Sequence, residues 1–230
     1  MIKALTFDLD DTLWEIWPVV ERAEELLHDW LAARYPRIPK QFTPLELRGL
    51  CSEAAAARPD LAYDRTWLRK QALKLAAQQA GYQEFDVEGA FAVFFIARNA
   101  VEPFAEVRPT LERLSRRYRL ASLSNGNADL RLIGLDDLFV FSLNAIDLRA
   151  AKPDPLFFQE ASRRLAARPD QIVHVGDDPE HDVFGAIQAG FRSVWVNRAR
   201  RNWPGGARAD AEIATLDGLE LLLAAWEERS

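Results

Sequence analysis

The chain has 230 residues and a net charge of −6, from 29 Lys and Arg against 35 Asp and Glu. A chain with this acidic balance is repelled by nucleic-acid phosphates and by anionic lipid, so neither nucleic acid nor a membrane surface is an expected partner. The single cysteine, Cys51, rules out an internal disulfide and favours a reducing compartment, and no run of about 18 apolar residues indicates a membrane span. We therefore expect a cytoplasmic protein.

Short apolar runs predict the strands of a single sheet. The first lies at residues 2–9, contains β-branched and aromatic side chains, and ends at a group of acids. Each later run follows a stretch with helical periodicity, which is typical of parallel strands joined by crossover helices. We predict an α/β fold with a Rossmann-like, doubly wound parallel sheet. Its further strands are expected at 120–123, 139–143, 172–175, 193–196 and 211–214, and its helices at 109–118, 154–167, 180–189 and 215–228.

Residues 15–101 interrupt this alternation. They contain no convincing strand, and segments with proline or glycine separate four helical stretches. These stretches lie at 16–34, 44–57, 64–80 and 86–100. An all-helical block between the first strand and the rest of a sheet indicates an inserted domain. We therefore predict a Rossmann-like core of residues 1–14 and 102–230, and an inserted helical domain of residues 15–101.

Acidic side chains follow the first predicted strand. Asp8 and Asp10 leave an extended segment on the same side, and Asp11 and Thr12 come next. Ligands of open parallel sheets bind at the carboxyl ends of strands, and two such close carboxylates repel each other unless a proton or a cation lies between them. The pattern favours a divalent-metal site. The alternative is a solvated loop or the N-cap of a helix.

Three later segments carry polar groups at comparable places. Residues 124–127, with the sequence Ser-Asn-Gly-Asn, follow a strand and could present backbone N–H groups to an anion, although the sequence is also ordinary turn chemistry. Lys152 precedes a helix, where its ammonium and the helix dipole would both favour a phosphate, the alternative being a surface lysine. Asp177 and Asp182 lie at the end of one strand and the start of the next helix.

The four segments, in this order, resemble the motifs of the haloacid dehalogenase superfamily in its phosphatase branch. The motifs are met by residues 8–12 (Asp-x-Asp-x-Thr), by Ser124, by Lys152, and by Gly176 and Asp177 with Asp182. The inserted helical domain lies between the first and second motifs, where this family carries its cap. The resemblance therefore implies the family's Rossmann-like core with a type I helical cap.

The resemblance implies phosphoryl transfer in two steps. Asp8 would attack phosphorus and form an aspartyl-phosphate, while Asp10 would protonate the leaving oxygen and then take a proton from the attacking water. Mg²⁺ is the implied cofactor. Asp8, Asp177 and the backbone carbonyl of Asp10 would hold it, with Asp178 and Asp182 as water-mediated ligands.

The resemblance also assigns the groups that bind phosphate. Ser124 and the backbone N–H of Asn125 would hold phosphoryl oxygens, and Lys152 would offset the negative charge shared by Asp8 and the phosphate. The dehalogenase branch of the family lacks an aspartate at the position of Asp10 and needs no metal, so Asp10 favours a phosphatase. The expected partner is a small-molecule phosphate ester.

The motifs are most similar to those of bacterial flavin mononucleotide (FMN) phosphatases, so FMN is the expected substrate. Trp14, Trp17 and Asn127 are candidate specificity residues, since a planar ring favours aromatic faces. The alternatives are a broad-specificity sugar or nucleotide phosphatase of the same family, and a phosphoacceptor signalling domain without turnover. His174 is expected to be a hydrogen-bonded core residue. The arginines at 198–201 are expected on an exposed loop face, the alternative being that they steer an anionic substrate.

Overall fold

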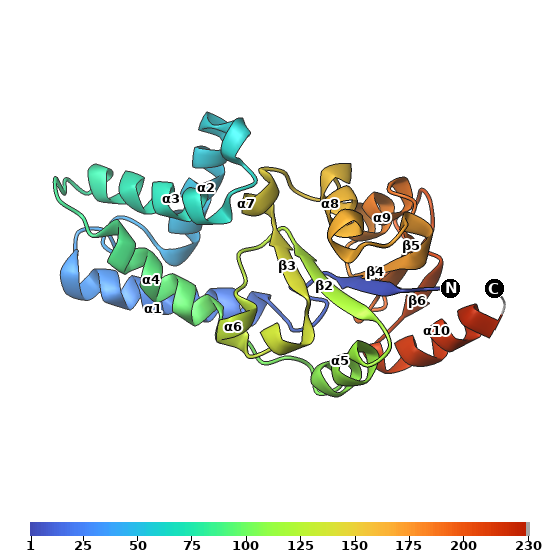
Figure 1. Cartoon of the computed structure of the whole chain (residues 1–230). Coiled ribbons are helices and arrows are strands. Elements are labelled where there is room, and N and C mark those ends of the chain that lie inside the picture. The colour runs from blue at the N-terminus through green and yellow to red at the C-terminus, as the bar shows by residue number, and fades with distance from the viewer. Residues whose placement is uncertain (229–230) are drawn as a thin grey trace. The chain divides into compact units, whose positions relative to one another are not determined.

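The chain folds into two compact units, and the computed structural model describes residues 1–228 (Figure 1). The first, here called the core unit, comprises Met1–Glu15, Glu102–Gly126 and the described chain from Ile133 onward. The second, here called the helical unit, comprises Ile16–Val101 and Asn127–Leu132.

A six-stranded parallel sheet forms the centre of the core unit, as predicted (Figure 1). Its strand order is β3-β2-β1-β4-β5-β6. The strands are β1 (Ala4–Phe7), β2 (Arg119–Ser124), β3 (Phe141–Asn144), β4 (Ile172–Gly176), β5 (Arg192–Val196) and β6 (Ala211–Ile213). The chain adds β2 and β3 on one side of β1 and then returns to the other side for β4. This reversal of strand order places the expected ligand crevice at the carboxyl ends of β1 and β4.

The buried strands explain why the sequence reads as short, continuous apolar runs. Every residue of β1 and β4 is buried, as in parallel sheets covered on both faces. The two polar exceptions satisfy each other, because Thr6 Oγ1 of β1 lies 2.8 Å from His174 Nδ1 of β4. The strand β1 ends at Phe7, earlier than the predicted limit at residue 9, and the acids follow in a turn.

The longer helices of the core unit overlap the predicted helical ranges, whereas two short helices at 130–133 and 145–148 lie outside them. They are α5 (Val107–Ser115), α7 (Ala145–Leu148), α8 (Pro155–Leu165), α9 (Gly185–Gln188) and α10 (Leu219–Glu228), while α6 (Leu130–Ile133) begins in the helical unit. The predicted helix at 180–189 differs in form, because it starts as a π-helical turn over Pro179–Phe184 before α9. Such turns are frequent at functional sites, and this one carries Asp182. Short 3₁₀ turns cover Pro59–Leu61, Asp136–Leu138, Pro169–Gln171 and Leu216–Gly218.

Four helices make up most of the helical unit, each within two residues of its predicted range. They are α1 (Trp17–Arg34), α2 (Pro44–Ala57), α3 (Arg65–Gln79) and α4 (Val87–Arg98). Side chains of Thr43, Asp64 and Asp86 cap the starts of α2, α3 and α4 by accepting backbone N–H groups, which fixes where these helices begin. Leucine, alanine and phenylalanine side chains from all four helices form one apolar cluster.

The segment Asn127–Leu132 groups with the helical unit, although the sequence analysis assigned it to the core. Two residues at the end of α4 hold it there. Arg98 Nε donates to Asn127 Oδ1 at 3.0 Å, and Asn99 Oδ1 accepts the Asp129 N–H at 2.8 Å. These contacts join residues about 30 positions apart in the sequence, so no local sequence pattern predicts them.

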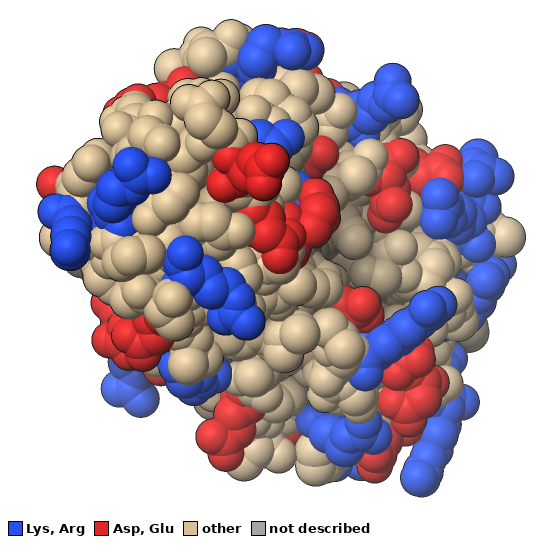
Figure 2. Space-filling view, turned by 90° about the vertical axis from the view of Figure 1, so that its left-hand side faces the viewer, with Lys and Arg blue, Asp and Glu red and all other residues tan. Residues whose placement is uncertain are grey.

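Charged side chains of both signs are interspersed over the face shown in Figure 2, which carries no extended basic area. This distribution agrees with the modest net negative charge of the chain. Among residues 1–228, no helix combines the length and apolar character needed to cross a membrane.

Candidate active site

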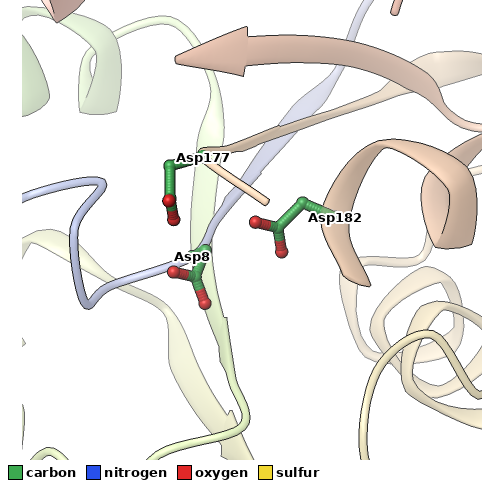
Figure 3. Close-up of side chains that lie close together, drawn as sticks. All are labelled: Asp8, Asp177 and Asp182. Atoms are coloured by element: carbon green, nitrogen blue, oxygen red, sulfur yellow. The ribbon is translucent and has the colours of Figure 1, made fainter. Parts of the chain in front are cut away.

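Three carboxylates converge at the carboxyl edge of the sheet. Asp8 directly follows β1, Asp177 follows β4, and Asp182 lies in the π-helical turn beyond it. Figure 3 shows the three side chains turned toward one another, and one oxygen of each lies within 4.8 Å of the others. This confirms that residues far apart in the sequence meet where the strand order reverses.

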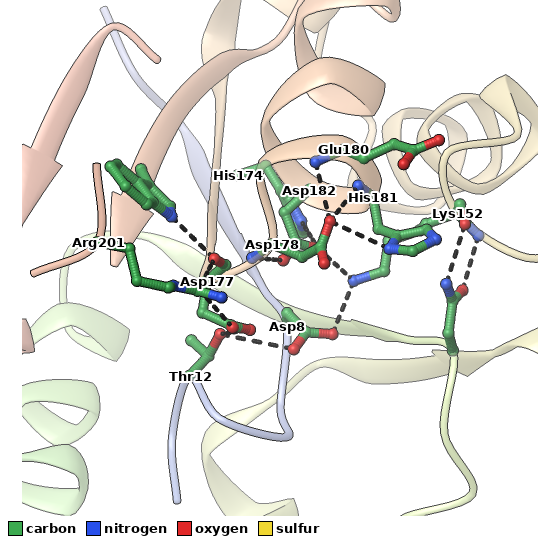
Figure 4. A network of polar contacts seen from close by, with 12 residues as sticks. Asp8, Thr12, Lys152, His174, Asp177, Asp178, Glu180, His181, Asp182 and Arg201 are labelled. Atoms are coloured by element: carbon green, nitrogen blue, oxygen red, sulfur yellow. Dashed lines mark hydrogen bonds and ion pairs between the residues drawn. The ribbon is translucent and has the colours of Figure 1, made fainter. Parts of the chain in front are cut away.

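Lys152 supplies the permanent positive charge of this cluster. Its Nζ lies 2.7 Å from Asp8 Oδ1 and 2.6 Å from Asp182 Oδ1, and the residue is only 2% exposed (Figure 4). Burial disfavours the charged form, but the Asp182 and Asp8 carboxylates outweigh it and raise the pKa of Lys152. The residue is therefore a buried ammonium ion and not a surface lysine.

Both carboxylate oxygens of Asp182 have close polar partners, and Lys152 is one of them. Besides the ammonium, its Oδ1 lies 3.2 Å from His174 Nε2, and its Oδ2 accepts the Asp178 N–H at 3.0 Å. Burial opposes ionisation, yet Lys152 and His174 hold the pKa of Asp182 below its ordinary value. Since Asp182 accepts from Nε2, the Nδ1 of His174 accepts from Thr6, and burial lowers the pKa of this histidine, which keeps it neutral. As expected, His174 is a hydrogen-bonded core residue.

Asp8 and Asp177 keep oxygen atoms with only weak partners. Thr12 Oγ1 lies 3.5 Å from Asp8 Oδ2 and 3.4 Å from Asp177 Oδ1, and Arg201 Nη2 lies 3.4 Å from Asp177 Oδ2. Burial raises the pKa of Asp8 well above its ordinary value despite Lys152, and burial with neighbouring carboxylates raises the pKa of Asp177 to about 7. The side chains present thus lack enough positive charge for both carboxylates. Carboxylate oxygens in this state fit a hard divalent cation such as Mg²⁺.

Asp10 is held by a tryptophan within a tight turn. Trp14 Nε1 donates to Asp10 Oδ1 at 2.9 Å, and the Asp11 N–H donates to the Trp14 carbonyl at 2.8 Å. Asp11 takes a left-handed conformation with φ 61°, which lets the chain reverse here. Trp14 has no exposed surface. Its expected role as an aromatic face for substrate is therefore corrected, because the ring is buried and its N–H is directed at Asp10.

The residues of the second motif support Lys152 as well as forming a turn. Ser124 Oγ accepts the Gly126 N–H at 3.0 Å. The Asn125 side chain bonds the backbone of Lys152 twice, from Nδ2 to the carbonyl at 2.9 Å and from the Lys152 N–H to Oδ1 at 2.7 Å. The sequence pattern predicts a role only for the backbone N–H of Asn125, and this use of its side chain leaves no local signal.

The remaining predicted site residues lie in other settings. Asp178 caps the π-helical turn, where its Oδ1 accepts the Glu180 and His181 N–H groups at 2.8 and 2.7 Å. Trp17, half-exposed, lies beneath the Arg48 guanidinium at 4.5 Å in the helical unit. Asn127 belongs to the same unit.

Arg200 and Arg201 are exposed, as expected of a loop face, whereas Arg198 is only partly exposed and forms specific contacts. Arg198 Nη2 donates to the Thr12 carbonyl at 3.0 Å, its Nη1 pairs with Glu106 at 2.8 Å, and its guanidinium stacks on Phe104 at 3.7 Å. The loop after β5 is thereby tied to the loop that carries Asp8 and Asp10. Nothing in the local sequence distinguishes these arginines from solvated ones.

Comparison with known proteins identifies the family. Residues 2–190 match the model of the haloacid dehalogenase-like hydrolases. Over 230 residues the chain is 31% identical to the 5-amino-6-(5-phospho-D-ribitylamino)uracil phosphatase YigB of Escherichia coli, covering 96% of each chain. It is also 30% identical to a phosphoserine phosphatase of Thermus thermophilus, covering 97% of this chain and 99% of that one.

A solved structure is similar over nearly the whole chain. It is a crystal structure of a 2-haloacid dehalogenase from Pseudomonas syringae pv. Tomato DC3000, with 41% sequence identity and a TM-score of 0.91. The match covers 98% of this chain and 100% of that one. The protein belongs to the haloacid dehalogenase-like hydrolases and has their α/β fold, as the motifs indicated. Its relatives include both phosphatases and dehalogenases, so the family alone leaves two reactions to distinguish.

The glycine before Asp177 leaves the space that Asp182 occupies. A Cβ on Gly176 would lie 2.3 Å from Asp182 Cγ, so Gly176→Ala should displace this carboxylate and loosen Lys152. We expect hydrolytic activity to fall by about 100-fold, the size typical of losing one preorganised charged contact. In the control, Gly49→Ala in α2, the added Cβ meets nothing within 4 Å. Activity of the folded Gly176→Ala variant equal to that of the control would contradict this role.

The raised pKa of Asp177 predicts a stability effect without metal. The folded protein retains the Asp177 proton up to about pH 7, while the unfolded chain releases it near 3.8, so ionisation between these values destabilises the fold. As pH rises from 4 to 8, wild type should lose about 2 to 4 kcal/mol relative to Asp177→Asn. Denaturant titrations of both proteins measure this difference. Mg²⁺ at pH 8 should stabilise wild type but not the variant, and a difference independent of pH would contradict the interpretation.

Proposed function

We propose that the protein is a Mg²⁺-dependent phosphatase that hydrolyses a small phosphate monoester through an aspartyl-phosphate at Asp8. The observation that carries this proposal is the setting of Asp8. One of its oxygens is bound by the Lys152 ammonium, the other has only a long contact to Thr12, and the buried carboxylate of Asp177 lies beside it. A phosphate ester brings its own negative charge to the site. A carboxylate in this setting is suited to attack it only when a cation also binds there.

The first chemical step forms a bond between an Asp8 oxygen and phosphorus and breaks the bond from phosphorus to the ester oxygen. Asp10, protonated, gives its proton to that leaving oxygen. Lys152 balances the charge that Asp8 and the phosphoryl group share, while Ser124 and the Asn125 N–H hold phosphoryl oxygens. Mg²⁺, held by Asp8, Asp177 and the Asp10 carbonyl, would supply further charge neutralisation when bound.

The second step returns the enzyme to its starting state. The Asp10 carboxylate takes a proton from water, and the water oxygen attacks phosphorus as the bond from phosphorus to Asp8 breaks. Inorganic phosphate leaves, Asp8 is again a carboxylate and Asp10 is again an acid. The same residue thus serves as acid and then as base, which requires that it stay in one place through both steps. The hydrogen bond from Trp14 supports this requirement.

Dehalogenation is the second candidate, favoured by the 41% identical structure titled as a dehalogenase. Asp8 would then displace halide from carbon, and water would hydrolyse the resulting ester. A halide leaves carbon without needing a proton, so Asp10 would have no role as a general acid. Halide displacement would also leave unexplained why Asp8 and Asp177 lie together with raised pKa values. These two features favour the phosphatase.

The proposed substrate is a phosphate ester of a ribityl chain that carries a flat ring, with FMN as the first candidate. Support comes from the motifs around Asp8 and from the Escherichia coli relative, whose named substrate is also a ribityl phosphate. A broader or different substrate specificity is the alternative, because one relative is a phosphoserine phosphatase.

Release of phosphate and halide tests the proposal. The purified protein is offered FMN, 5-amino-6-(5-phospho-D-ribitylamino)uracil, phosphoserine, sugar and nucleoside monophosphates, and 2-chloropropionate, each with Mg²⁺ and with a chelator. Chelator-sensitive release of phosphate with a preference for the ribityl esters supports both reaction and substrate. Even turnover across the phosphate esters would remove the ribityl assignment alone. Halide release that resists the chelator supports the dehalogenase, and phosphorylation without turnover supports a signalling domain.

Replacing the nucleophile separates catalysis from folding. Asp8→Asn removes the attacking carboxylate together with its repulsion from Asp177, so turnover should fall below detection while thermal stability stays equal or rises. Circular dichroism and phosphate release measure the two effects. Retention of one tenth or more of the activity by the folded variant would show that another group attacks phosphorus.

The Trp14 N–H should matter most when the leaving group needs a proton. Trp14→Phe keeps an aromatic ring but removes the bond to Asp10, so we expect about tenfold slower hydrolysis of an alkyl phosphate and a much smaller effect on p-nitrophenyl phosphate. Trp30→Phe, a change of the same kind in the helical unit, should leave the ratio of the two rates unchanged. If Trp14→Phe slows both esters equally, Trp14 acts only in packing.

A further inference from the structure

Arg201 is a positively charged neighbour of Asp177, whereas the Lys152 ammonium contacts Asp8 and Asp182. Arg201 Nη2 donates to the Asp177 backbone carbonyl at 2.9 Å and lies 3.4 Å from its carboxylate Oδ2 (Figure 4). The Arg201 side chain is 53% exposed, whereas that of Asp177 is 21% exposed. The ion pair is therefore long and open to solvent on the arginine side.

The backbone of Arg201 is nevertheless firmly placed. The buried side chain of Asn197 accepts the Arg201 N–H at Oδ1 and donates from Nδ2 to the Arg201 carbonyl, both at 2.8 Å. The same Nδ2 reaches Glu212 of β6 at 2.6 Å. The loop thus fixes the start of the arginine side chain, while its exposed guanidinium is held through the hydrogen bond to the Asp177 carbonyl and the long contact to the carboxylate.

The surroundings of the guanidinium give it room to leave Asp177. A cavity of about 400 Å³ adjoins this pair, and Asp11, Glu15, Asp177 and Arg201 are among its lining residues. If the guanidinium moves away, the Asp177 carbonyl keeps its other donor, Trp195 Nε1 at 2.8 Å. Departure of Arg201 therefore frees the carboxylate without disturbing the loop that carries it.

Lys152 and Arg201 differ in burial and in the length of their contacts to carboxylates, which determine whether another cation can replace them. Lys152 is buried and makes two short contacts, so removing it would leave buried charges unpaired. Arg201 is half-exposed and makes one long contact to the carboxylate, so water can replace it at little cost. One cation belongs to the site permanently and the other can be exchanged.

We propose that Arg201 is a displaceable counter-ion of Asp177, which pairs with this carboxylate when it is ionised in the cation-free protein and competes with the divalent cation for it. Arg201 thereby sets the affinity for Mg²⁺. This inference rests on the cation site of the proposed function, but it concerns binding and not turnover.

Calorimetric titration with MgCl₂, without substrate, tests the competition. Arg201→Gln removes the charge and retains a donor for the Asp177 carbonyl, so Mg²⁺ should bind about fivefold tighter, the upper range for one half-exposed ion pair. Arg201→Lys keeps the charge and Arg200→Gln changes the exposed arginine one position earlier. Both should bind Mg²⁺ within about twofold of wild type. Thermal unfolding of each variant verifies that it is folded.

Three results would overturn the proposal. Arg201→Gln could bind Mg²⁺ no tighter than wild type, Arg201→Lys could gain as much affinity as Arg201→Gln, or wild type could bind no Mg²⁺ at all. The outcome is separate from that of the phosphatase assay. A protein that hydrolyses no phosphate ester but shows the expected order of affinities would contradict the proposed function and support the role of Arg201.

Discussion

The structure of the site depends on an excess of negative charge in a confined volume. Three carboxylates lie within 4.8 Å of one another, and one buried ammonium, Lys152, bonds two of them. Burial, together with the neighbouring carboxylates, makes Asp8 and Asp177 ionise less readily than free aspartates. In the proposed mechanism the missing positive charge arrives with Mg²⁺, and the negative charge of the phosphate is accepted because of it. The arrangement supports the proposed recruitment of a cation for binding an anion.

Hydrogen bonds from several separate segments hold Lys152 and its partner Asp182 in place. His174 and the Asp178 N–H hold Asp182, Asp182 holds the ammonium, and the Asn125 side chain holds the lysine backbone. These residues come from separate loops and strands that meet only because β1 lies between β2 and β4. A change at one of them therefore affects the position of the lysine even when it does not touch Asp8.

Local sequence was sufficient for much of the fold and for the principal site residues. Strand β1 and the four helices of the helical unit could be predicted because an apolar run, and the proline and glycine segments between helices, leave a signal within a few residues. Asp8, Lys152 and Asp177 could be predicted because each directly follows a strand or precedes a helix. Resemblance to a family, and not the pattern of any one segment, gave them their roles.

Contacts between distant segments could not be predicted in this way. Trp14 looks like any large apolar residue until its N–H is seen to point at Asp10, and Arg201 resembles a solvated loop residue until Asn197 is seen to fix its backbone. The grouping of Asn127–Leu132 with the helical unit likewise depends on residues at the end of α4. In each case the determining partner belongs to a contact that sequence spacing does not reveal.

Rapid acid quenching detects the covalent bond between Asp8 and phosphorus on which the proposed mechanism depends. The enzyme is mixed with Mg²⁺ and ³²P-labelled p-nitrophenyl phosphate, stopped within the first turnover, and digested for mass spectrometry. We expect protein-bound phosphate on the peptide that contains Asp8, at a level that rises before free phosphate appears. Continued turnover with no phosphate on that peptide, or phosphate on another residue, would contradict that mechanism.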